Sequence, residues 1–374
     1  MCILRSIIAR VFMWLPLVCT NAVAAPFAYV TNFYQEPGSV SVIDVATHEV
    51  VATIEVGWRP EGVAIHPTGK WVYVANYWSS SVSVIDAATN TVVSTIGVGD
   101  NPGGLVVDPT GTLLYVPSYW NSTVEVVDLE TETIIQTIPL GQSAGPWGMA
   151  INPAGTYLYV ADYWLNNLKV VDTRTWQVTT ITDHFYGDDP NFGDAPYSVA
   201  VNPSGTRVYV TAYWRGGSVH PGGLVVIDGE TNQAITSFLV GNRPVGVAVH
   251  PSGERVYVTN FGDDTLSVID AGTNTVIATV PVGDGPRGVS VDPSGRYVYV
   301  ANQEDGTVSV VDSETLMVIE TVGVGYGPRA LGQFIGPAPT SSDPAAVPAL
   351  AGWVLMWMAA ALGLSGLVRL RRPA

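Results

Sequence analysis

Two groups of residues in this chain have types and spacings that suit ligand binding. Tyrosine–tryptophan pairs occur at residues 77–78, 119–120, 163–164 and 213–214. Arginines occur in other units of the internal repeat that is described below. Exposed indole rings mark interaction surfaces, and arginine beside aromatic rings suits an anionic or carbohydrate-like ligand. The candidate binding residues are Trp78, Trp120, Trp164, Trp214, Trp147, Tyr197, Arg59, Arg243, Arg287 and Arg329.

A structural role is the alternative for the arginines. Acidic residues that would neutralise the arginines in salt bridges follow two later segments of the same pattern. They are Asp263, Asp264, Glu304 and Asp305.

Two long segments contain side chains that could bind a metal ion. Residues 182–196 and 215–223 are longer than their counterparts elsewhere in the chain, and they contain His184, Asp188, Asp189 and His220. Imidazoles with carboxylates bind transition metals, and oxygen ligands alone bind calcium. No recognised ligand spacing supports a metal site, so a lid or a partner-contact loop is the alternative.

Motifs for covalent catalysis are missing. The chain has no G-x-S-x-G motif and no glycine-rich phosphate loop, and its two cysteines, Cys2 and Cys19, lie at the N-terminus. We therefore expect no catalytic residues, no cofactor and a non-enzymatic module that binds a protein or a glycan. The alternative is a periplasmic hydrolase or lactonase-like enzyme with a metal site.

An internal repeat must position these residues. Seven tetrads related to Tyr-Val-Thr-Asn begin at Tyr29, Tyr73, Tyr115, Tyr159, Tyr209, Tyr257 and Tyr299. Each full unit contains four short apolar segments, A to D, separated by turn residues. A period in the low forties with this content is typical of the blades of a β-propeller.

The blade pattern assigns the candidate residues to one face. The D–A and B–C connections share this face, which we call the top, and the A–B and C–D turns share the bottom. The tryptophans that end the Tyr-Trp pairs are expected at loop tips, while the tyrosines before them are expected to pack between blades. An aspartate ends every C segment with threonine three residues later, which indicates a hydrogen-bonded turn. His66 and His250, in A–B turns, are expected to be structural.

The ends of the repeat predict how the ring closes. The first unit lacks an A segment, and the last is followed by an A-like segment at 330–335. Pairing this segment with the N-terminal unit would remove both open edges. We therefore predict an all-β, seven-bladed propeller of four-stranded blades over residues 26–337.

The tetrads, the P-x-G turns and the V-[IV]-D-x-x-T turns resemble those of the YVTN family of β-propeller repeat proteins. That family is related to exported surface-layer and lactonase-like propellers. The resemblance spans about residues 27–335 and implies the fold rather than an activity.

The two ends of the chain predict export and membrane attachment. Residues 1–25 are typical of a signal peptide, residues 338–348 form a linker with a sorting motif, and 349–368 are long and apolar enough for a transmembrane helix. Residues 369–374 would be a basic cytoplasmic end. The order of VPALAGW, apolar helix and arginines resembles IPTL-CTERM sorting tails, relatives of PEP-CTERM. This resemblance implies a Gram-negative host and a sorting enzyme; a plain membrane anchor is the alternative.

Charge excludes one class of partner. Of 16 basic residues, two lie in 1–25 and three in 338–374, which leaves 11 in the repeats; of 32 acidic residues, only Asp343 lies outside them, which leaves 31. A net charge of −20 argues against nucleic acid, whose phosphates require a basic surface. We expect an exported monomer on the periplasmic side or the cell surface.

Overall fold

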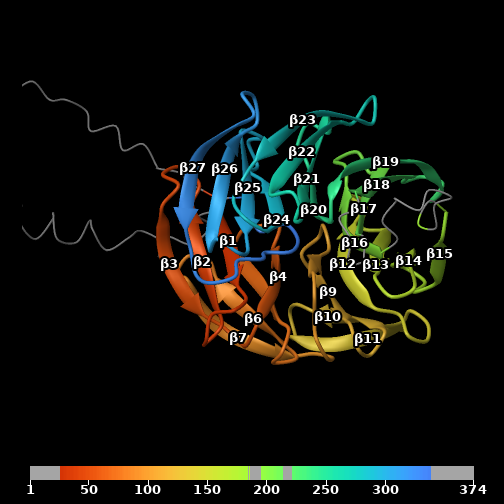
Figure 1. Cartoon of the computed structure of the whole chain (residues 1–374). Helices are drawn as coiled ribbons and strands as arrows, with labels where there is room; N and C mark the ends of the chain where they lie inside the picture. Colours follow the sequence, from red (N-terminus) through yellow and green to blue (C-terminus); the bar gives the residue numbers. More distant parts are fainter. Residues whose placement is uncertain (1–25, 184, 186–194, 214–220, 338–374) are drawn as a thin grey trace, which may run out of the picture.

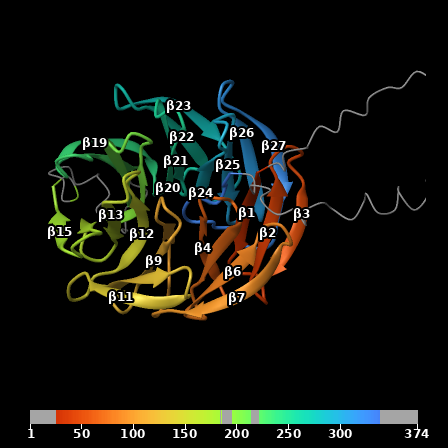
Figure 2. The same ribbon diagram turned by 180° about the vertical axis from the view of Figure 1, so that it is seen from behind.

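The computed structural model describes residues 26–337 except 184, 186–194 and 214–220. These residues form seven antiparallel sheets arranged in a ring around a central axis (Figure 1). The first strand of each complete sheet lies nearest the axis and the last lies at the outside, as the reverse view also shows (Figure 2). The prediction of an all-β, seven-bladed propeller is confirmed.

The strands follow the repeat in order. The first four blades contain β1 (Phe27–Asn32), β2 (Ser39–Asp44) and β3 (Val50–Glu55); β4 (Pro60–Ile65), β5 (Trp71–Asn76), β6 (Ser81–Asp86) and β7 (Thr91–Gly97); β8 (Val106–Val107), β9 (Leu113–Ser118), β10 (Thr123–Asp128) and β11 (Thr133–Pro139); β12 (Pro146–Ile151), β13 (Tyr157–Asp162), β14 (Asn167–Asp172) and β15 (Val178–Ile181).

The last three blades contain β16 (Ala195–Val201), β17 (Arg207–Tyr213), β18 (Pro221–Asp228) and β19 (Ala234–Asn242); β20 (Pro244–Val249), β21 (Arg255–Asn260), β22 (Thr265–Asp270) and β23 (Thr275–Pro281); β24 (Pro286–Val291), β25 (Tyr297–Asn302), β26 (Thr307–Asp312) and β27 (Met317–Gly323).

Burial explains the strand sequences. The second strand of a blade is buried on both faces and is therefore mostly apolar, as in WVYVAN. The third strand is also buried but alternates apolar with polar residues, as in SVSVID, and the outer strand keeps exposed side chains. The tetrad tyrosines fill the space between successive blades. The hydroxyl of Tyr159 donates to Asn232 Oδ1 of the next blade at 2.8 Å, and Tyr299 Oη lies 2.8 Å from His48 Nδ1 across the ring closure. In blades four and seven the tetrad tyrosine thus ties the blade to its neighbour by a hydrogen bond.

The bottom turns are closed by their own polar side chains. Asp44 Oδ1 accepts the backbone N–H groups of Ala46 and Thr47 at 2.7 and 3.2 Å, and Asp312 accepts in the same way from Glu314 and Thr315. The structural role predicted for these aspartates is confirmed.

The two bottom-face histidines bond the next blade. His66 Nε2 lies 3.0 Å from the carbonyl oxygen of Gly111, and His250 Nε2 lies 2.8 Å from that of Gly295. Their predicted structural role is also confirmed.

The C-terminal segment pairs with the first blade and closes the ring, as predicted, but it is not the regular strand expected at 330–335. Pairing begins earlier, at the bridge between Pro328 and Asn32, and ends at the bridge between Ile335 and Ala28. Eight residues, from Pro328 to Ile335, lie between these two bridges opposite β1. In the next blade the six residues of β4 pair with the equivalent length of β5. The surplus forms a bulge rather than a continuous strand, because Ala330 and Gly332 have φ angles of 48° and 105°.

The bulge turns inward to the neighbouring blade. The N–H of Leu331 donates to the carbonyl oxygen of Glu61 at 3.2 Å, and its own carbonyl accepts from the N–H of Val63 at 2.9 Å. The end of the propeller therefore hydrogen-bonds to β1 and to β4. This connection places its side chains near the axis.

The predictions for the two ends of the chain remain predictions. The signal peptide, the sorting tail and the helix at 349–368 lie outside the described residues. Within the described part of the chain, no helix is long and apolar enough to cross a membrane.

Candidate functional site

The D–A and B–C connections meet at the top of the ring, as predicted. The N–H groups of Tyr77 and Trp78 donate to the carbonyl oxygens of Arg59 and Trp58 at 3.0 and 3.1 Å. The N–H of Phe261 donates to the carbonyl oxygen of Arg243 in the same way, at 3.0 Å. These bonds fix the backbone from which the top-face side chains project.

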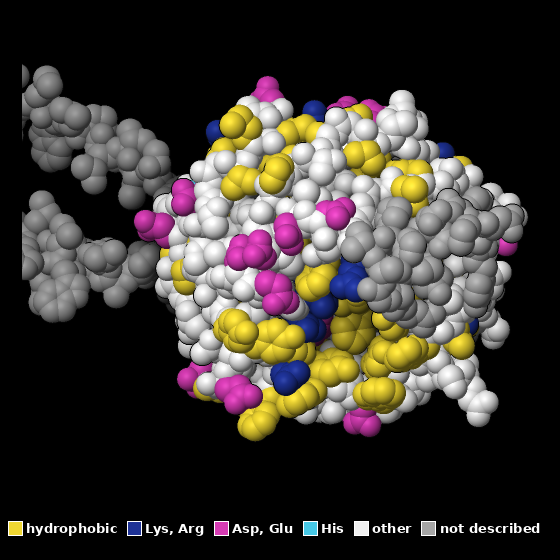
Figure 3. Space-filling view, in the orientation of Figure 1, with side chains coloured by type: hydrophobic (Ala, Val, Ile, Leu, Met, Phe, Trp, Pro, Cys, Tyr) yellow, Lys and Arg dark blue, Asp and Glu magenta, His cyan; other side chains and the backbone are white. Residues whose placement is uncertain are grey.

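A hollow of about 240 Å³ opens at the axis of this face, and we call it the mouth. In Figure 3 hydrophobic side chains and dark blue basic side chains surround the depression. Its lining residues are Tyr77, Tyr119, Trp147, Tyr163, Tyr197, Tyr213, Arg287 and Arg329. The aromatic rings contact one another; Trp147 lies 5.3 Å from Tyr119 and 5.7 Å from Tyr197, centroid to centroid. The wall is therefore a connected aromatic surface.

The tyrosines of the Tyr-Trp pairs correct an expectation. They were expected to pack between blades, but all four line the mouth. The corresponding residues of the last two blades are Phe261 and Gln303. This restriction to blades two to five was visible in the sequence and was the signal that could have identified them.

The ring-closing bulge packs against a residue that lines the mouth. Leu331 is buried and packs with Tyr197 and Val245. It also fills space at Gly104, where a Cβ atom would lie 3.3 Å from Leu331 Cδ2. A leucine from the end of the propeller thus packs against the aromatic wall.

Arg329 is held by a buried ion pair. Its Nη1 lies 2.6 Å from Glu61 Oε2, and the two side chains are 11% and 2% exposed. The guanidinium carbon also lies 3.4 Å from the ring centroid of Phe33. Burial lowers the pKa of Arg329, but the charge and hydrogen bond of Glu61, together with Tyr197 and Tyr34, outweigh it and raise the pKa above its ordinary value. The arginine therefore stays charged.

Arg287 is positioned by a tyrosine. Its Nη1 donates to Tyr197 Oη at 2.6 Å, and its guanidinium carbon lies 5.0 Å from the ring centroid of Phe261. Three buried N–H groups of mouth residues have no acceptor among the described residues: Arg287 Nε, Arg329 Nε and Trp147 Nε1. A buried donor without an acceptor costs about 1–3 kcal/mol, which a ligand oxygen or a water would relieve.

The tyrosine hydroxyls are neutral donors at physiological pH. Burial raises the pKa of Tyr77, Tyr119 and Tyr197 above the ordinary value. The mouth therefore combines fixed positive charge with protonated hydroxyls on an apolar wall. This combination suits a small ring compound that carries negative charge or develops it during a reaction.

The other predicted binding residues that the structure describes do not belong to the lining of the mouth. Trp78, Trp120 and Trp164 are 53%, 63% and 46% exposed and do not line it. Arg59 stacks on Trp78, with its guanidinium carbon 3.5 Å from the ring centroid. Arg243 does not line the mouth either. Of the ten candidates, the structure brings Trp147, Tyr197, Arg287 and Arg329 together.

The acidic residues expected to neutralise the arginines instead bind backbone or neighbouring groups. Asp263, Asp264 and Asp305 accept N–H groups of Asn242, Gly285 and Asp284, and Glu304 accepts from Gln303. The partner of Arg329 is Glu61, which the sequence reading missed because it lies within an apolar inner strand.

The metal candidates cannot be located in the structure. His184, Asp188, Asp189 and His220, together with Trp214, lie outside the described residues. Among the residues that are described, no group of three or more histidine, cysteine or acidic side chains is placed to hold a metal ion.

Comparison with known families and structures adds two partial matches. A model of the family described as lactonase, 7-bladed beta-propeller matches residues 227–317. A model of the cytochrome D1 heme domain matches residues 20–104. Each match covers less than half of the chain. A search of curated protein sequences gave no match.

Solved structures share the fold. A hydrazine synthase chain from Kuenenia stuttgartiensis is 21% identical with a TM-score of 0.67, over 80% of this chain and 99% of that one. A functionally unknown protein from Desulfotomaculum acetoxidans is 14% identical with a TM-score of 0.66, over 82% and 100%. At these sequence identities the similarity shows the propeller fold alone.

The family matches correct the expectation of a non-enzymatic module. Both families are described by an activity or a heme. That expectation rested on missing nucleophile motifs and cysteines. A site that works through arginines and tyrosines on an aromatic wall needs neither, so the missing motifs did not exclude an enzyme.

Proposed function

We propose that this protein is an exported hydrolase that opens a small lactone in the mouth. The observation that carries the proposal is the convergence of Arg287, Arg329 and protonated tyrosines on one hollow of about 240 Å³. Ligand sites of small molecules usually have volumes of roughly 300–1000 Å³, so the mouth suits a single small ring. The lactonase match across the last blades supports the same class.

Binding would use the walls and the charges separately. The apolar face of the ring would lie against Trp147 and the neighbouring tyrosines. The ester oxygens, or a carboxylate elsewhere on the substrate, would accept hydrogen bonds from the arginines. The N–H groups that lack an acceptor are the donors available for this purpose.

The chemistry is the addition of water to an ester carbonyl. Water attacks the carbonyl carbon, the carbonyl oxygen gains negative charge, and the bond between that carbon and the ring oxygen then breaks. The ring oxygen takes up a proton and the product is a hydroxy acid. Donors that are fixed before the reaction stabilise the charge that develops on the carbonyl oxygen, and removal of one such donor typically costs about 2.7–4 kcal/mol of activation free energy.

Direct measurement of ring opening tests the proposal. The full chain would be presented with a panel of γ- and δ-lactones, with and without a carboxylate, and acid release would be titrated at constant pH. We expect turnover that falls at least 10-fold in Arg287→Met and stays unchanged in Trp120→Ala. Ring opening no faster than the buffer background with every lactone would overturn the proposal.

A metal contribution is tested in the same assay. Turnover is measured after equilibration with EDTA and again after addition of Zn²⁺ or Ca²⁺. This tests for a metal ion of the kind that residues 182–196 and 215–223 could bind. Loss and recovery of turnover would add a metal-activated water to the mechanism.

Binding of a tetrapyrrole is the second candidate, and the cytochrome D1 heme domain match favours it. The mouth could contact such a ring through aromatic stacking and pair its carboxylates with arginines. The described histidines do not fit axial ligation, because His48, His66 and His250 bond Tyr299, Gly111 and Gly295 away from the mouth. Titration with hemin, monitored by its absorbance, separates this candidate from the first.

Export and attachment belong to the same proposal. They rest on the sequence of residues 1–25 and 338–374 and would put the mouth on the outer side of a membrane. Protease accessibility of the intact cell's protein before and after outer-membrane permeabilisation would distinguish the periplasm from the surface.

A further inference from the structure

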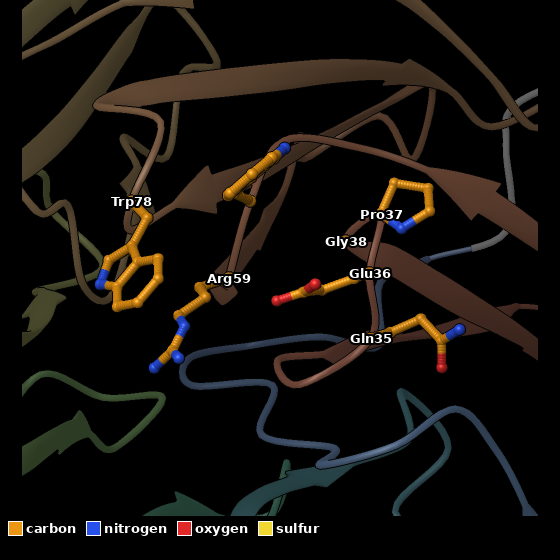
Figure 4. A pocket seen from close by; sticks show the side chains of 7 residues that line it. Gln35, Glu36, Pro37, Gly38, Arg59 and Trp78 are labelled. Carbon is orange, nitrogen blue, oxygen red and sulfur yellow. The ribbon is translucent and has the colours of Figure 1, made fainter.

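A second hollow lies on the top face beside the mouth, and we call it the rim groove. Its volume is about 260 Å³, and it is lined by Gln35, Glu36, Pro37, Gly38, Trp58, Arg59 and Trp78. The close-up in Figure 4 shows most of these side chains around one space. None of them lines the mouth. The rim groove is therefore a separate place where a ligand could bind.

The backbone of the rim groove is held firmly. The N–H of Trp58 donates to Ser79 Oγ at 2.8 Å, and the N–H of Val56 donates to the carbonyl oxygen of Gly38 at 2.8 Å. The two loops approach so closely that a Cβ atom on Gly38 would collide with the carbonyl oxygen of Gly57. A rigid backbone reduces the entropy lost when a ligand binds.

Two indole rings are exposed on this rigid base. Trp58 is 60% exposed and Trp78 is 53% exposed. Exposed tryptophan gains little from folding, so its position here calls for an explanation outside the core. The flat apolar face of an indole stacks on the C–H face of a sugar ring in the same way that it stacks on other flat apolar groups.

Arg59 supplies donors at a fixed place. Its guanidinium carbon lies 3.5 Å from the ring centroid of Trp78, and no described residue accepts a hydrogen bond from its N–H groups. The carboxylate of Glu36 points toward Arg59 in Figure 4, yet the two side chains form no ion pair within the described structure. The space between them can therefore accept polar groups of a ligand.

The charges select the class of ligand. An anion is attracted by Arg59 but repelled by Glu36. A cation is attracted by Glu36 but repelled by Arg59. A hydroxyl group both accepts and donates, so neighbouring hydroxyls can accept from the guanidinium and donate to the carboxylate at the same time. We propose that the rim groove binds a neutral saccharide, with its ring against an indole and its hydroxyls between Arg59 and Glu36.

This site would act independently of the mouth. Phe33 separates the two, because Arg59 lies 5.2 Å from its ring centroid and Arg329 lies 3.4 Å from the same centroid. A saccharide in the rim groove would hold the protein on a glycan surface close to the mouth without entering it.

Calorimetric titration of the full chain with neutral oligosaccharides tests the proposal. The probes are the tetrasaccharides of glucose in α-1,4 and β-1,4 linkage and of N-acetylglucosamine, with a tetragalacturonate and a proline-rich peptide for comparison. We expect binding of at least one neutral probe, a weaker affinity for the galacturonate, and no binding of the peptide.

Matched variants assign the binding to this groove. Trp58→Ala and Glu36→Ala should each weaken the neutral probe at least 10-fold. Trp120→Ala removes an equally exposed indole elsewhere on the top face and should leave the affinity unchanged. Binding of the peptide instead of the sugars, no sugar binding at all, or equal losses in Trp58→Ala and Trp120→Ala would each overturn the proposal. Lactone turnover measures the mouth alone. A failure of the saccharide proposal is therefore distinguishable from a failure of the lactonase proposal.

Discussion

The bottom and the top of the propeller use polar residues in opposite ways. On the bottom, aspartate and histidine side chains bond the turns of their own blade or the next one, as Asp312 does with Thr315 and His250 with Gly295. On the top, arginines and tyrosines crowd around the axis, and Nε of Arg287 and Nε of Arg329 have no acceptor among the described residues. Side chains that bond the backbone stabilise a scaffold, whereas arginine donors that lack an acceptor beside a hollow are available to a ligand.

The largest effect should follow removal of Arg329, which lines the mouth and forms the buried ion pair. Arg329→Met leaves the carboxylate of Glu61 buried and unpaired, which should lower the free energy of unfolding by about 3–5 kcal/mol. Urea denaturation monitored by circular dichroism measures it. The double variant Glu61→Gln with Arg329→Met should recover most of the stability but not the lactone turnover. If Arg329→Met alone were as stable as the parent, the ion pair would not contribute to the stability of the propeller.

Two buried tyrosines allow a matched test of the two faces. Tyr197→Phe removes the hydroxyl bonded to Arg287, and Tyr159→Phe removes the one bonded to Asn232 near the bottom. Each variant should lose about 1 kcal/mol of stability. The first should also lose roughly 10-fold in kcat/KM, equivalent to about 1.4 kcal/mol, while the second should keep it. Equal kinetic losses would mean that the difference between the faces is not functional.

Acid should weaken the bottom turns first. The hydrogen bond from the Arg174 side chain, together with backbone N–H groups, lowers the pKa of Asp172 to about 2. A carboxyl whose pKa is lowered in the folded state stabilises the fold above its ordinary pKa near 4 and loses that contribution as the pH falls toward 2. Unfolding followed between pH 5 and 2 should show a decline that is smaller in Asp172→Asn. Because this carboxyl is exposed, solvent screens the effect and the difference should be modest.

The smallest effect should come from the outer tryptophans. Trp120 is 63% exposed and contacts Tyr119 edge to face, with ring centroids 5.1 Å apart. Trp120→Ala should change the free energy of unfolding by no more than about 0.5 kcal/mol, as is usual for surface positions. Lactone turnover should be unaffected in the same assay. A clear loss of turnover would extend the site from the mouth to the rim.

The architecture was predictable because it repeats. Seven tetrads at nearly constant spacing define the number of blades, and the turn residues between them assign each loop to a face. Arg287 and Arg329 could be placed at the top for this reason. Periodicity also revealed the missing inner strand of the first blade.

The site itself was only partly predictable, because it depends on departures from the repeat. The direction of Tyr77 and its counterparts depends on how the end of each second strand meets the axis, which the period does not encode. Leu331 reaches the axis through a bulge of two extra residues, and Glu61 is a single acid in an apolar strand. Local irregularities of this kind decide a site while leaving the fold unchanged.

The closing bulge makes the site a late product of synthesis. Arg329 and Leu331 come after all seven tetrads in the chain, yet Arg329 lines the mouth and Leu331 packs against Tyr197 of its wall. A ribosome-bound chain, or one clipped before residue 328, could fold most of its blades and still lack these two residues. Activity at the mouth would therefore require that the whole propeller has been translated and that the ring has closed. Incomplete chains would be inactive.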